Sequence, residues 1–205
     1  MEQLSLFGGP STSNEYFKIT DGEYIHIPDF FNKKEASKYF EALKQDIKWK
    51  QEEILMYGKL IKFPRLTAWY GEDDKPYSFS GLKLTPQPWN DDLLSIKRRI
   101  EPKSDVKFNS VLLNFYRDGN DSISWHTDAE KELGINPVIA SVNFGAERKF
   151  QLKHRQNGEK IDINLQHGSL LIMKGELQHH WLHQVPKTKS LVGERINLTF
   201  RVIKI

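Results

Sequence analysis

The sequence predicts an α+β fold that is mainly β, in which N-terminal helices pack on a double-stranded β-helix, or jelly roll. Helical periodicity occurs only in the first half of the chain, at about residues 32–43 and 90–101. From about residue 108 onward, short apolar or β-branched runs alternate with Gly, Asn and Asp turns. Many short strands of this kind are typical of a sandwich or barrel, and helices ahead of them pack on one sheet.

The length and composition favour one cytoplasmic domain. A chain of 205 residues fits a single domain with a short tail, and it buries roughly 70% of its unfolded surface. Cysteine is absent, which excludes disulfides, thiolate zinc sites and iron–sulfur clusters and fits a reducing compartment. There is no secretory signal pattern and no run of about 18 apolar residues, so we expect neither export nor a membrane span. The net charge of +3 permits nucleic-acid binding without requiring it.

Two helices are predicted ahead of the strands. Asn32 is a candidate cap for the first helix, and Glu35, three residues later, completes a capping box. Asn90 is the candidate cap of the second helix, which covers about residues 90–101. Each helix has an apolar stripe at helical spacing, formed by Ala36, Phe40 and Leu43 in the first and by Leu93, Ile96 and Ile100 in the second.

The strands are predicted from apolar or alternating runs that end at turn residues. The first run, Val111–Tyr116, ends at Asp118-Gly119. The remaining runs cover residues 138–144, 148–154, 160–165, 170–174, 180–184 and 196–203.

His126, Asp128 and His183 are candidate metal ligands. Two histidines and one carboxylate form a three-ligand face with open positions, which is typical of a non-haem Fe(II) that activates oxygen. Residues two apart in a strand point to the same side, so His126 and Asp128 are expected to reach one ion. The jelly roll would bring His183 to them from a distant strand.

The same segments have a second interpretation. Thr127-Asp-Ala-Glu130 also fits a capping box that begins a short helix at residues 131–133. His179, His180 and His183 would then be surface residues of an aromatic strand. Because His-x-Asp is a short pattern that occurs by chance, the triad alone does not decide between the two interpretations.

Arg195–Arg201 is an alternating strand with one apolar and one polar face. Ile196, Leu198 and Phe200 share the apolar face, and the polar face carries Arg195, Asn197, Thr199 and Arg201. A solvated polar face would make this an ordinary outer strand. A polar face inside the roll would form an anion pocket, because the arginine guanidinium pairs with carboxylates through two hydrogen bonds.

The chain resembles the AlkB family of Fe(II)/2-oxoglutarate dioxygenases over about residues 20–205. The pattern His126-x-Asp128, His183 and Arg195-x-Asn-Leu-Thr-Phe-Arg201 is similar to the family signature. Further segments resemble the family in the same order, namely Pro64-Arg-Leu-Thr-Ala-Trp-Tyr-Gly71, Tyr77-Ser-Phe-Ser-Gly81, Asn114-Phe-Tyr116, Ala140-Ser-Val-Asn-Phe-Gly145 and His167-Gly-Ser-Leu-Leu-Ile-Met173.

The resemblance implies a set of ligands and a reaction. Fe(II) would be held by His126, Asp128 and His183. The co-substrate 2-oxoglutarate would be held by Asn114, Tyr116, Arg195, Asn197, Thr199 and Arg201. With O2, the co-substrate would give succinate and CO2, and an N-methyl group of a damaged DNA base would leave as formaldehyde. The lesions typical of the family are 1-methyladenine and 3-methylcytosine.

The resemblance also implies a nucleotide-recognition lid over about residues 50–90, ahead of a jelly-roll core at about 108–205. Such an enzyme flips the base out of the duplex or acts on single strands. Phe79 resembles the family residue that stacks on the base and clamps it against His126, and such stacking contributes about 1–3 kcal/mol. The other implied substrate contacts are Tyr57, Gly58, Lys59, Arg65 and Tyr77, with Lys59 and Arg65 expected at phosphates.

The residue after the metal aspartate departs from the family pattern. Many members carry a second acidic residue there, or one position later, that contacts the base. This chain has Ala129 followed by Glu130, so Glu130 is the candidate substitute. The preference among methylated, ethylated and etheno-bridged bases is therefore not determined by the resemblance.

Residues 1–15 are predicted to form a flexible tail, because Gly8-Gly9-Pro10 and the polar residues after them break regular structure. Within it, Gln3, Leu4, Leu6 and Phe7 resemble the short peptide by which bacterial repair proteins bind the DNA sliding clamp. This similarity favours a bacterial source and the double-strand repair branch of the family. Alternatively, the apolar residues of the tail cover the surface of the domain at residues 16–205.

Three functions remain as alternatives at this point. The first is a DNA dealkylating dioxygenase, and the second is a dioxygenase of the same fold that acts on RNA, a protein or a metabolite. The third is a catalytically silent nucleic-acid binding module. The intact triad and both arginines argue against the third, and basic clusters with the lid segment favour the first. Nothing in the sequence requires more than a monomer.

Overall fold

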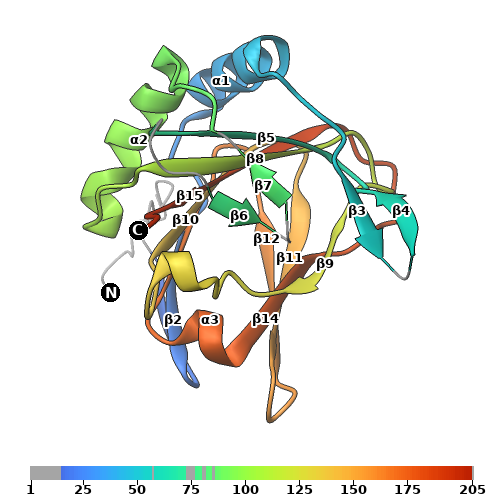
Figure 1. Cartoon of the computed structure of the whole chain (residues 1–205). Helices are drawn as coiled ribbons and strands as arrows, with labels where there is room; N and C mark the ends of the chain where they lie inside the picture. The colour runs from blue at the N-terminus through green and yellow to red at the C-terminus, as the bar shows by residue number, and fades with distance from the viewer. Residues whose placement is uncertain (1–14, 57, 73–76, 80–81, 85, 205) are drawn as a thin grey trace, which may run out of the picture.

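A computed structural model describes residues 15–56, 58–72, 77–79, 82–84 and 86–204. It contains two facing antiparallel sheets, with the two long helices against the outer face of the larger one (Figure 1). The larger, seven-stranded sheet has the order β1-β2-β13-β10-β15-β8-β5, and the four-stranded sheet has the order β12-β11-β14-β9. The predicted jelly roll with N-terminal helices is therefore confirmed.

The elements of the larger sheet are β1 (Glu15–Ile19), β2 (Gly22–Ile27), β5 (Leu66–Gly71), β8 (Ser110–Tyr116), β10 (Ile139–Gly145), β13 (Leu170–Lys174) and β15 (Arg195–Arg201). Those of the smaller sheet are β9 (Ile123–His126), β11 (Arg148–His154), β12 (Lys160–Leu165) and β14 (Trp181–Val185). The helices are α1 (Lys33–Asp46), α2 (Asp91–Ser104), the short 3-10 turn η1 (Lys131–Leu133) and α3 (Leu177–His180).

The two predicted helices begin where their caps indicate. The side chain of Asn32 accepts from the backbone N–H of Glu35, and the Glu35 carboxylate accepts in return from the N–H of Asn32, so the capping box is complete. Asn90 caps α2 through the N–H of Leu93. None of the described helices is long and apolar enough to cross a membrane.

Side chains alternate between the two faces of the central strands, so one face packs in one hydrophobic core and the other face in a second. In β15, Ile196, Leu198 and Phe200 pack in the core that α1 and α2 cover. The other face of β15 points between the sheets, where strands of both sheets contribute to the second core. Because β15 is covered on both sides, every one of its residues is buried.

The β1–β2 hairpin and β5 extend the larger sheet beyond the predicted core at 108–205. A two-residue turn at Thr20-Asp21 joins β1 to β2, and Asp21 has a φ of +50°. Asp21-Gly22 between two alternating runs indicates a hairpin in this region, although the turn itself is formed by Thr20 and Asp21, one residue earlier than an Asp-Gly turn would place it. β5 pairs with β8, so a strand of the larger sheet lies within the segment at about 50–90 that was expected to form the lid.

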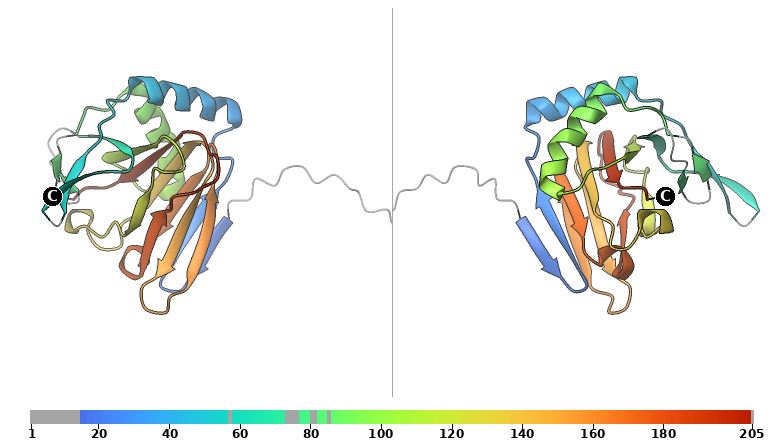
Figure 2. Two further views of the ribbon diagram at one scale, coloured as in Figure 1. Left: turned by 90° about the vertical axis from the view of Figure 1, so that its right-hand side faces the viewer. Right: turned by 60° about the vertical axis from the view of Figure 1, so that its left-hand side comes forward.

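Two small hairpins lie outside the main sheets within residues 50–90. The first pairs β3 (Glu53–Met56) with β4 (Lys59–Lys62), and the second pairs β6 (Tyr77–Phe79) with β7 (Leu82–Leu84). The β3–β4 hairpin projects away from the two sheets in both views of Figure 2. Leu55 and Leu60 are opposite each other in this hairpin and both 69% exposed, so they form an apolar pair on the surface.

Candidate metal and co-substrate site

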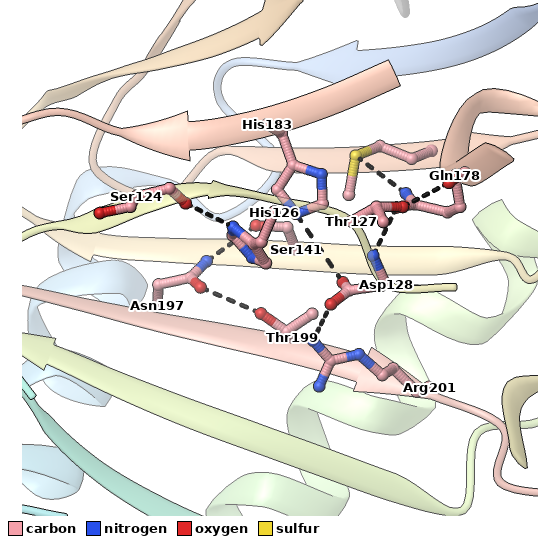
Figure 3. Close-up of polar contacts among 11 residues, drawn as sticks. Ser124, His126, Thr127, Asp128, Ser141, Gln178, His183, Asn197, Thr199 and Arg201 are labelled. Atoms are coloured by element: carbon pink, nitrogen blue, oxygen red, sulfur yellow. Dashed lines mark hydrogen bonds and ion pairs between the residues drawn. The ribbon is translucent and has the colours of Figure 1, made fainter. Parts of the chain in front are cut away.

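His126 and His183 meet because β9 and β14 are neighbours in the smaller sheet. The two residues are directly opposite each other in the antiparallel register, and their ring centroids are 4.1 Å apart. Figure 3 shows both rings directed toward the space between the sheets. The pairing of two strands therefore places two imidazoles side by side, although the residues are far apart in the sequence.

Asp128 lies beyond the strand, which corrects the expectation that His126 and Asp128 share one strand face. β9 ends at His126, and the next residues contact α3 instead of a strand neighbour. The Thr127 hydroxyl donates to the backbone carbonyl of Gln178, and the N–H of Asp128 donates to the Gln178 side-chain oxygen at 2.9 Å. These bonds turn the chain so that the Asp128 carboxylate points to the two histidines (Figure 3).

The capping interpretation of this segment is wrong, although a short helical turn does follow it. η1 begins at Lys131 with Glu130 at its N-cap, and no side chain caps it. The Thr127 hydroxyl, which would have been the capping group, is bonded to Gln178. His183 is buried at 4% exposure, so it is not a surface histidine.

The Asp128 carboxylate is held on one side and directed into the site on the other. Arg201 donates from Nη2 to Asp128 Oδ1 at 2.8 Å across the space between the sheets. Asp128 Oδ2 lies 4.0 Å from His183 Nε2, too far for a hydrogen bond. The three candidate ligand atoms of His126, Asp128 and His183 all lie within 4.8 Å of one another.

The electrostatics of the three side chains suit metal binding. Burial lowers the pKa of His183 to about 3, and nearby His126 adds to this effect. Burial likewise lowers the pKa of His126. Burial alone would raise the pKa of Asp128, but the charge of Arg201 and the two imidazoles lower it to about 2. At neutral pH the site therefore presents two neutral imidazoles and one carboxylate, which are the protonation states that bind metal.

The polar face of β15 lines the same cavity as the three candidate ligands. All six residues expected to hold the co-substrate face this cavity. Its described lining consists of Leu112, Asn114, Tyr116, Ile123, His126, Asp128, Ser141, Phe150, Met173, His183, Val185, Arg195, Asn197, Thr199 and Arg201. Of the two interpretations of the arginine strand, the structure therefore supports the interior pocket.

Arg195 is a buried cation with unused hydrogen-bonding capacity. The side chain is 1% exposed, and its guanidinium lies 4.9 Å from the centre of the Tyr116 ring. Nη2 donates to Asn143, but Nε and Nη1 have no hydrogen-bond partner among the described residues. Burial lowers the pKa of Arg195 to about 10, so the side chain stays charged at neutral pH. Two buried, unpaired N–H donors on a cation are what a carboxylate ligand would satisfy.

The comparisons with known proteins agree with this geometry. Residues 23–201 match the model of the 2OG-Fe(II) oxygenase superfamily. The DNA oxidative demethylase ALKBH2 of Mus musculus is 40% identical over 184 residues, which cover 84% of this chain and 77% of that protein. This chain belongs to the AlkB family of 2OG-Fe(II) oxygenases. Members of the superfamily use Fe(II) and 2-oxoglutarate with O2.

Other AlkB relatives and one solved structure extend the comparison. Alpha-ketoglutarate-dependent dioxygenase alkB homolog 3 of Bos taurus is 44% identical over 186 residues, or 86% of this chain. The match spans 64% of that relative, so this chain covers less than two thirds of it. The solved structure of OsALKBH1 superposes with a TM-score of 0.63 over 90% of this chain and 100% of the other. At 13% identity, that likeness concerns the fold alone.

The described residues of this AlkB protein fit Fe(II) and 2-oxoglutarate. His126 Nδ1 donates to the Ser124 carbonyl at 2.8 Å, which leaves the lone pair of Nε2 for a metal. Asp128 is ionised and His183 is neutral, and two imidazoles with one carboxylate are a typical Fe(II) donor set. Arg195 offers its unpaired N–H groups to a carboxylate in the same cavity.

A second group of potential ligands does not pass the same test. Asp21, His154 and His180 also bring ligand atoms within 4.8 Å of one another. The backbone N–H of Asn157 donates to His154 Nδ1 at 3.2 Å, so the proton of the neutral ring is on Nε2. The Nε2–H group of His154 lies 3.1 Å from Asp21 Oδ2 and donates a hydrogen bond to it. The tautomer is the reverse of that in His126, and it leaves no lone pair for a metal.

Two polar residues that bond to the predicted site residues were themselves not predicted, namely Ser141, which lines the cavity, and Asn143. Asn197 donates from its amide to Ser141 Oγ at 2.8 Å and to Asn143 Oδ1 at 3.1 Å, and Thr199 donates to Asn197 Oδ1. Ser141 and Asn143 are two apart in β10 and share its inner face. The same period-two rule that selected the polar face of β15 would have identified them.

Arg65 is not a phosphate contact, which corrects the expectation for this residue. Its side chain is 4% exposed and lies over the Phe63 ring at 4.9 Å. Nε donates to Asn114 Oδ1 at 2.7 Å, and Nη1 donates to the Ser122 carbonyl. Arg65 therefore fixes Asn114, which lines the cavity, from inside the protein.

The remaining expected substrate contacts belong to separate segments of the chain. Gly58 and Lys59 are exposed at the end of the β3–β4 hairpin, and Gly58 has a φ of +75° that favours glycine. Tyr57 lies outside the described residues, and so do the side chains of Tyr77 and Phe79 in β6. Glu130 is half-buried at the N-cap of η1 and does not belong to the described cavity lining.

Proposed function

We propose that this protein repairs alkylated DNA by oxidative demethylation of 1-methyladenine and 3-methylcytosine. The observation that carries the proposal is one cavity that gathers two neutral imidazoles, an ionised carboxylate and a buried arginine with unpaired donors. The names of the relatives, an alpha-ketoglutarate-dependent dioxygenase and a DNA oxidative demethylase, support it. The balanced reaction consumes O2 and 2-oxoglutarate and releases formaldehyde, succinate and CO2 with the repaired base.

The residues of the cavity have distinct tasks in this proposal. His126, Asp128 and His183 hold Fe(II), which supplies the activation of O2 when it is bound. Arg195 binds one carboxylate of 2-oxoglutarate, and Tyr116 keeps the guanidinium in place beneath it. Asn114, Asn197, Thr199 and Arg201 complete the polar lining and orient the co-substrate. Apolar side chains such as Phe150 and Val185 exclude water from the cavity.

The β3–β4 hairpin is the proposed DNA-contacting part of the lid. It carries exposed leucines and the exposed Lys59, and it projects beyond the sheets (Figure 2). A base must leave the helix to reach a buried cavity, and exposed apolar side chains beside a cation suit a surface that takes up unstacked DNA.

Lys59→Ala is expected to weaken binding of a methylated oligonucleotide to a similar degree for every sequence. A lysine that meets a phosphate releases a counterion, so its loss lowers the slope of log affinity against log salt by about 1. Fluorescence anisotropy at several salt concentrations measures this slope. Lys149→Ala is the control, because Lys149 is exposed but lies in the β11–β12 hairpin, where it is paired with Asp162. An unchanged slope for Lys59→Ala would remove this residue from the DNA interface.

Formaldehyde release tests the proposed function directly. The full chain is incubated with Fe(II), 2-oxoglutarate and single- or double-stranded oligonucleotides that contain 3-methylcytosine, with unmethylated strands as the control. We expect formaldehyde and succinate in equal amounts only with the methylated DNA. Turnover of methylated RNA alone, or of no methylated strand, would instead support a dioxygenase that acts on RNA, a protein or a metabolite.

We further propose that Gln3, Leu4, Leu6 and Phe7 bind a bacterial DNA sliding clamp and direct the protein to duplex DNA. These residues lie outside the described part of the chain, so the proposal rests on their resemblance to clamp-binding peptides. A short peptide that becomes ordered only when it binds can recognise a partner in this way at an entropic cost. Deleting residues 1–8 is expected to abolish co-purification with a bacterial clamp. Equal clamp binding by the full-length and shortened chains would contradict the proposal.

A further inference from the structure

Gln178 connects the two segments that carry the candidate metal ligands. It lies in α3, five residues before His183, and its side chain is completely buried at 0% exposure. Its side-chain oxygen accepts from the backbone N–H of Asp128 at 2.9 Å, and its backbone carbonyl accepts from the Thr127 hydroxyl. Its amide nitrogen donates to Met173 Sδ at 3.6 Å (Figure 3). The residue is therefore bonded on one side to the loop of Asp128 and on the other to β13.

The backbone N–H of Asp128 has no partner in the sheet and bonds to the side chain of Gln178 instead. The pairing of β9 with β14 reaches His126 opposite His183, and β9 ends there. Asp128 is 1% exposed, so its backbone N–H is out of reach of water and needs a partner. Gln178 supplies that partner through its side chain and fixes the peptide from which the carboxylate extends.

Asp128 is thus constrained at both ends of its side chain. Gln178 holds the backbone, and Arg201 holds Oδ1, which leaves Oδ2 toward His183. Loss of the backbone contact would let the loop rotate while the ion pair with Arg201 stayed formed. The carboxylate would then no longer face both imidazoles at once.

We propose that Gln178 is a positioning residue of the metal site, and that its side-chain oxygen sets the orientation of Asp128 for the ion. This inference rests on the Fe(II) site of the proposed function. It assigns no contact between Gln178 and the metal, the co-substrate or the DNA. Groups that orient metal ligands typically change metal affinity by 10- to 100-fold when they are removed.

Gln178→Met tests the proposal, because methionine has nearly the same shape but no hydrogen-bond acceptor of comparable strength. The metal-free full-length protein is titrated with Mn2+, a redox-stable substitute for Fe(II), and bound metal is followed by electron paramagnetic resonance. We expect Mn2+ to bind about 10- to 100-fold more weakly than to the parent protein. Turnover is expected to recover at high Fe(II), since the defect lies in metal retention.

Two further variants separate positioning from folding. Gln184→Met is the matched control, because Gln184 follows His183 directly but bonds to Gln151. It is expected to bind Mn2+ like the parent. Gln178→Glu keeps an oxygen acceptor for the Asp128 N–H and is expected to bind Mn2+ more tightly than Gln178→Met. Melting temperatures of the metal-free proteins show whether each variant is folded.

The outcomes distinguish this inference from the proposed function. Equal Mn2+ affinity of folded Gln178→Met and the parent would overturn the positioning role while the metal site stood. An equal loss of Mn2+ affinity in Gln178→Met and Gln178→Glu would also overturn it, because the missing oxygen acceptor would then not explain the loss. A parent protein that bound no Mn2+ would overturn both the inference and the proposed Fe(II) chemistry.

Discussion

His183→Leu is expected to remove Fe(II) binding and to lower demethylation by about a thousandfold or more. Leucine has a volume similar to that of histidine and preserves packing against Phe150, whose ring centre is 5.4 Å from that of His183. The substitution removes one of three candidate ligands. Metal-assisted stabilisation of a transition state amounts to several kcal/mol, and about 4 kcal/mol corresponds to a factor of about 10³ in rate.

Metal content and formaldehyde release measure this result on the same samples. His180→Leu is the control, since His180 precedes His183 by three residues but belongs to the group with Asp21 and His154. It is expected to keep the metal and most of the activity. If His183→Leu retained stoichiometric iron, or if His180→Leu lost it, the assignment of the two histidine groups would be wrong.

Arg195→Met is expected to have opposite effects on co-substrate binding and on stability. Truncating one partner of a buried charge pair costs about 2–5 kcal/mol, so the affinity for 2-oxoglutarate should fall by roughly 30-fold to several thousandfold. Titration of the Mn2+-loaded protein with 2-oxoglutarate measures this loss. The affinity for Mn2+ alone should change little, because Arg195 bonds to Asn143 and none of the three candidate ligands.

The metal-free Arg195→Met protein is expected to melt at a higher temperature than the parent. The buried guanidinium leaves two N–H donors without a partner in the described residues, and each such group costs about 1–3 kcal/mol. The lost bond to Asn143 and the contact with Tyr116 offset part of this gain. For a protein of this size, 1 kcal/mol changes the melting temperature by about 2–4 °C.

Arg148→Met is the matched control for the effect on stability. Arg148 is also buried, but it donates to the carbonyls of Asp118, Asp121 and Pro186. Its replacement leaves three acceptors unsatisfied and should lower the melting temperature. If both variants were destabilised to the same degree, the N–H groups of Arg195 would have partners within the protein. That result would contradict the proposal that they are available to bind a carboxylate of the co-substrate.

Local patterns predicted much of the fold correctly. The capping residues Asn32 and Asn90 fixed the beginning of both long helices because a cap acts within a few residues of sequence. β11, β12 and β13 begin and end at the predicted residues, since their runs are bounded by turns. His126 and Asp128 were expected to share one side of a strand, but β9 ends at His126, and the backbone N–H of Asp128 bonds to Gln178 instead.

The members of the site were predictable from the sequence, but their arrangement was not. Two histidines, one aspartate and an alternating Arg-Asn-Thr-Arg face are visible as residue types and spacings. Whether the face of β15 met solvent depended on a second sheet that packs over it. Arginine is usually found at the surface, and the sequence alone offered no reason to expect Arg65 elsewhere. It is buried because Asn114 and a backbone carbonyl accept its hydrogen bonds.

The sequence by itself determined the two long helices, most strands of the jelly-roll core and the chemical groups available for an iron site. These properties follow from periodicity and side-chain chemistry, which act over short stretches of chain. Only the tertiary structure decided that β9 and β14 place His126 opposite His183, and that Gln178 and Arg201 aim Asp128 between the sheets. Contacts between distant segments are chosen by sheet packing and by the need to satisfy buried polar groups, and neither leaves a local pattern in the sequence.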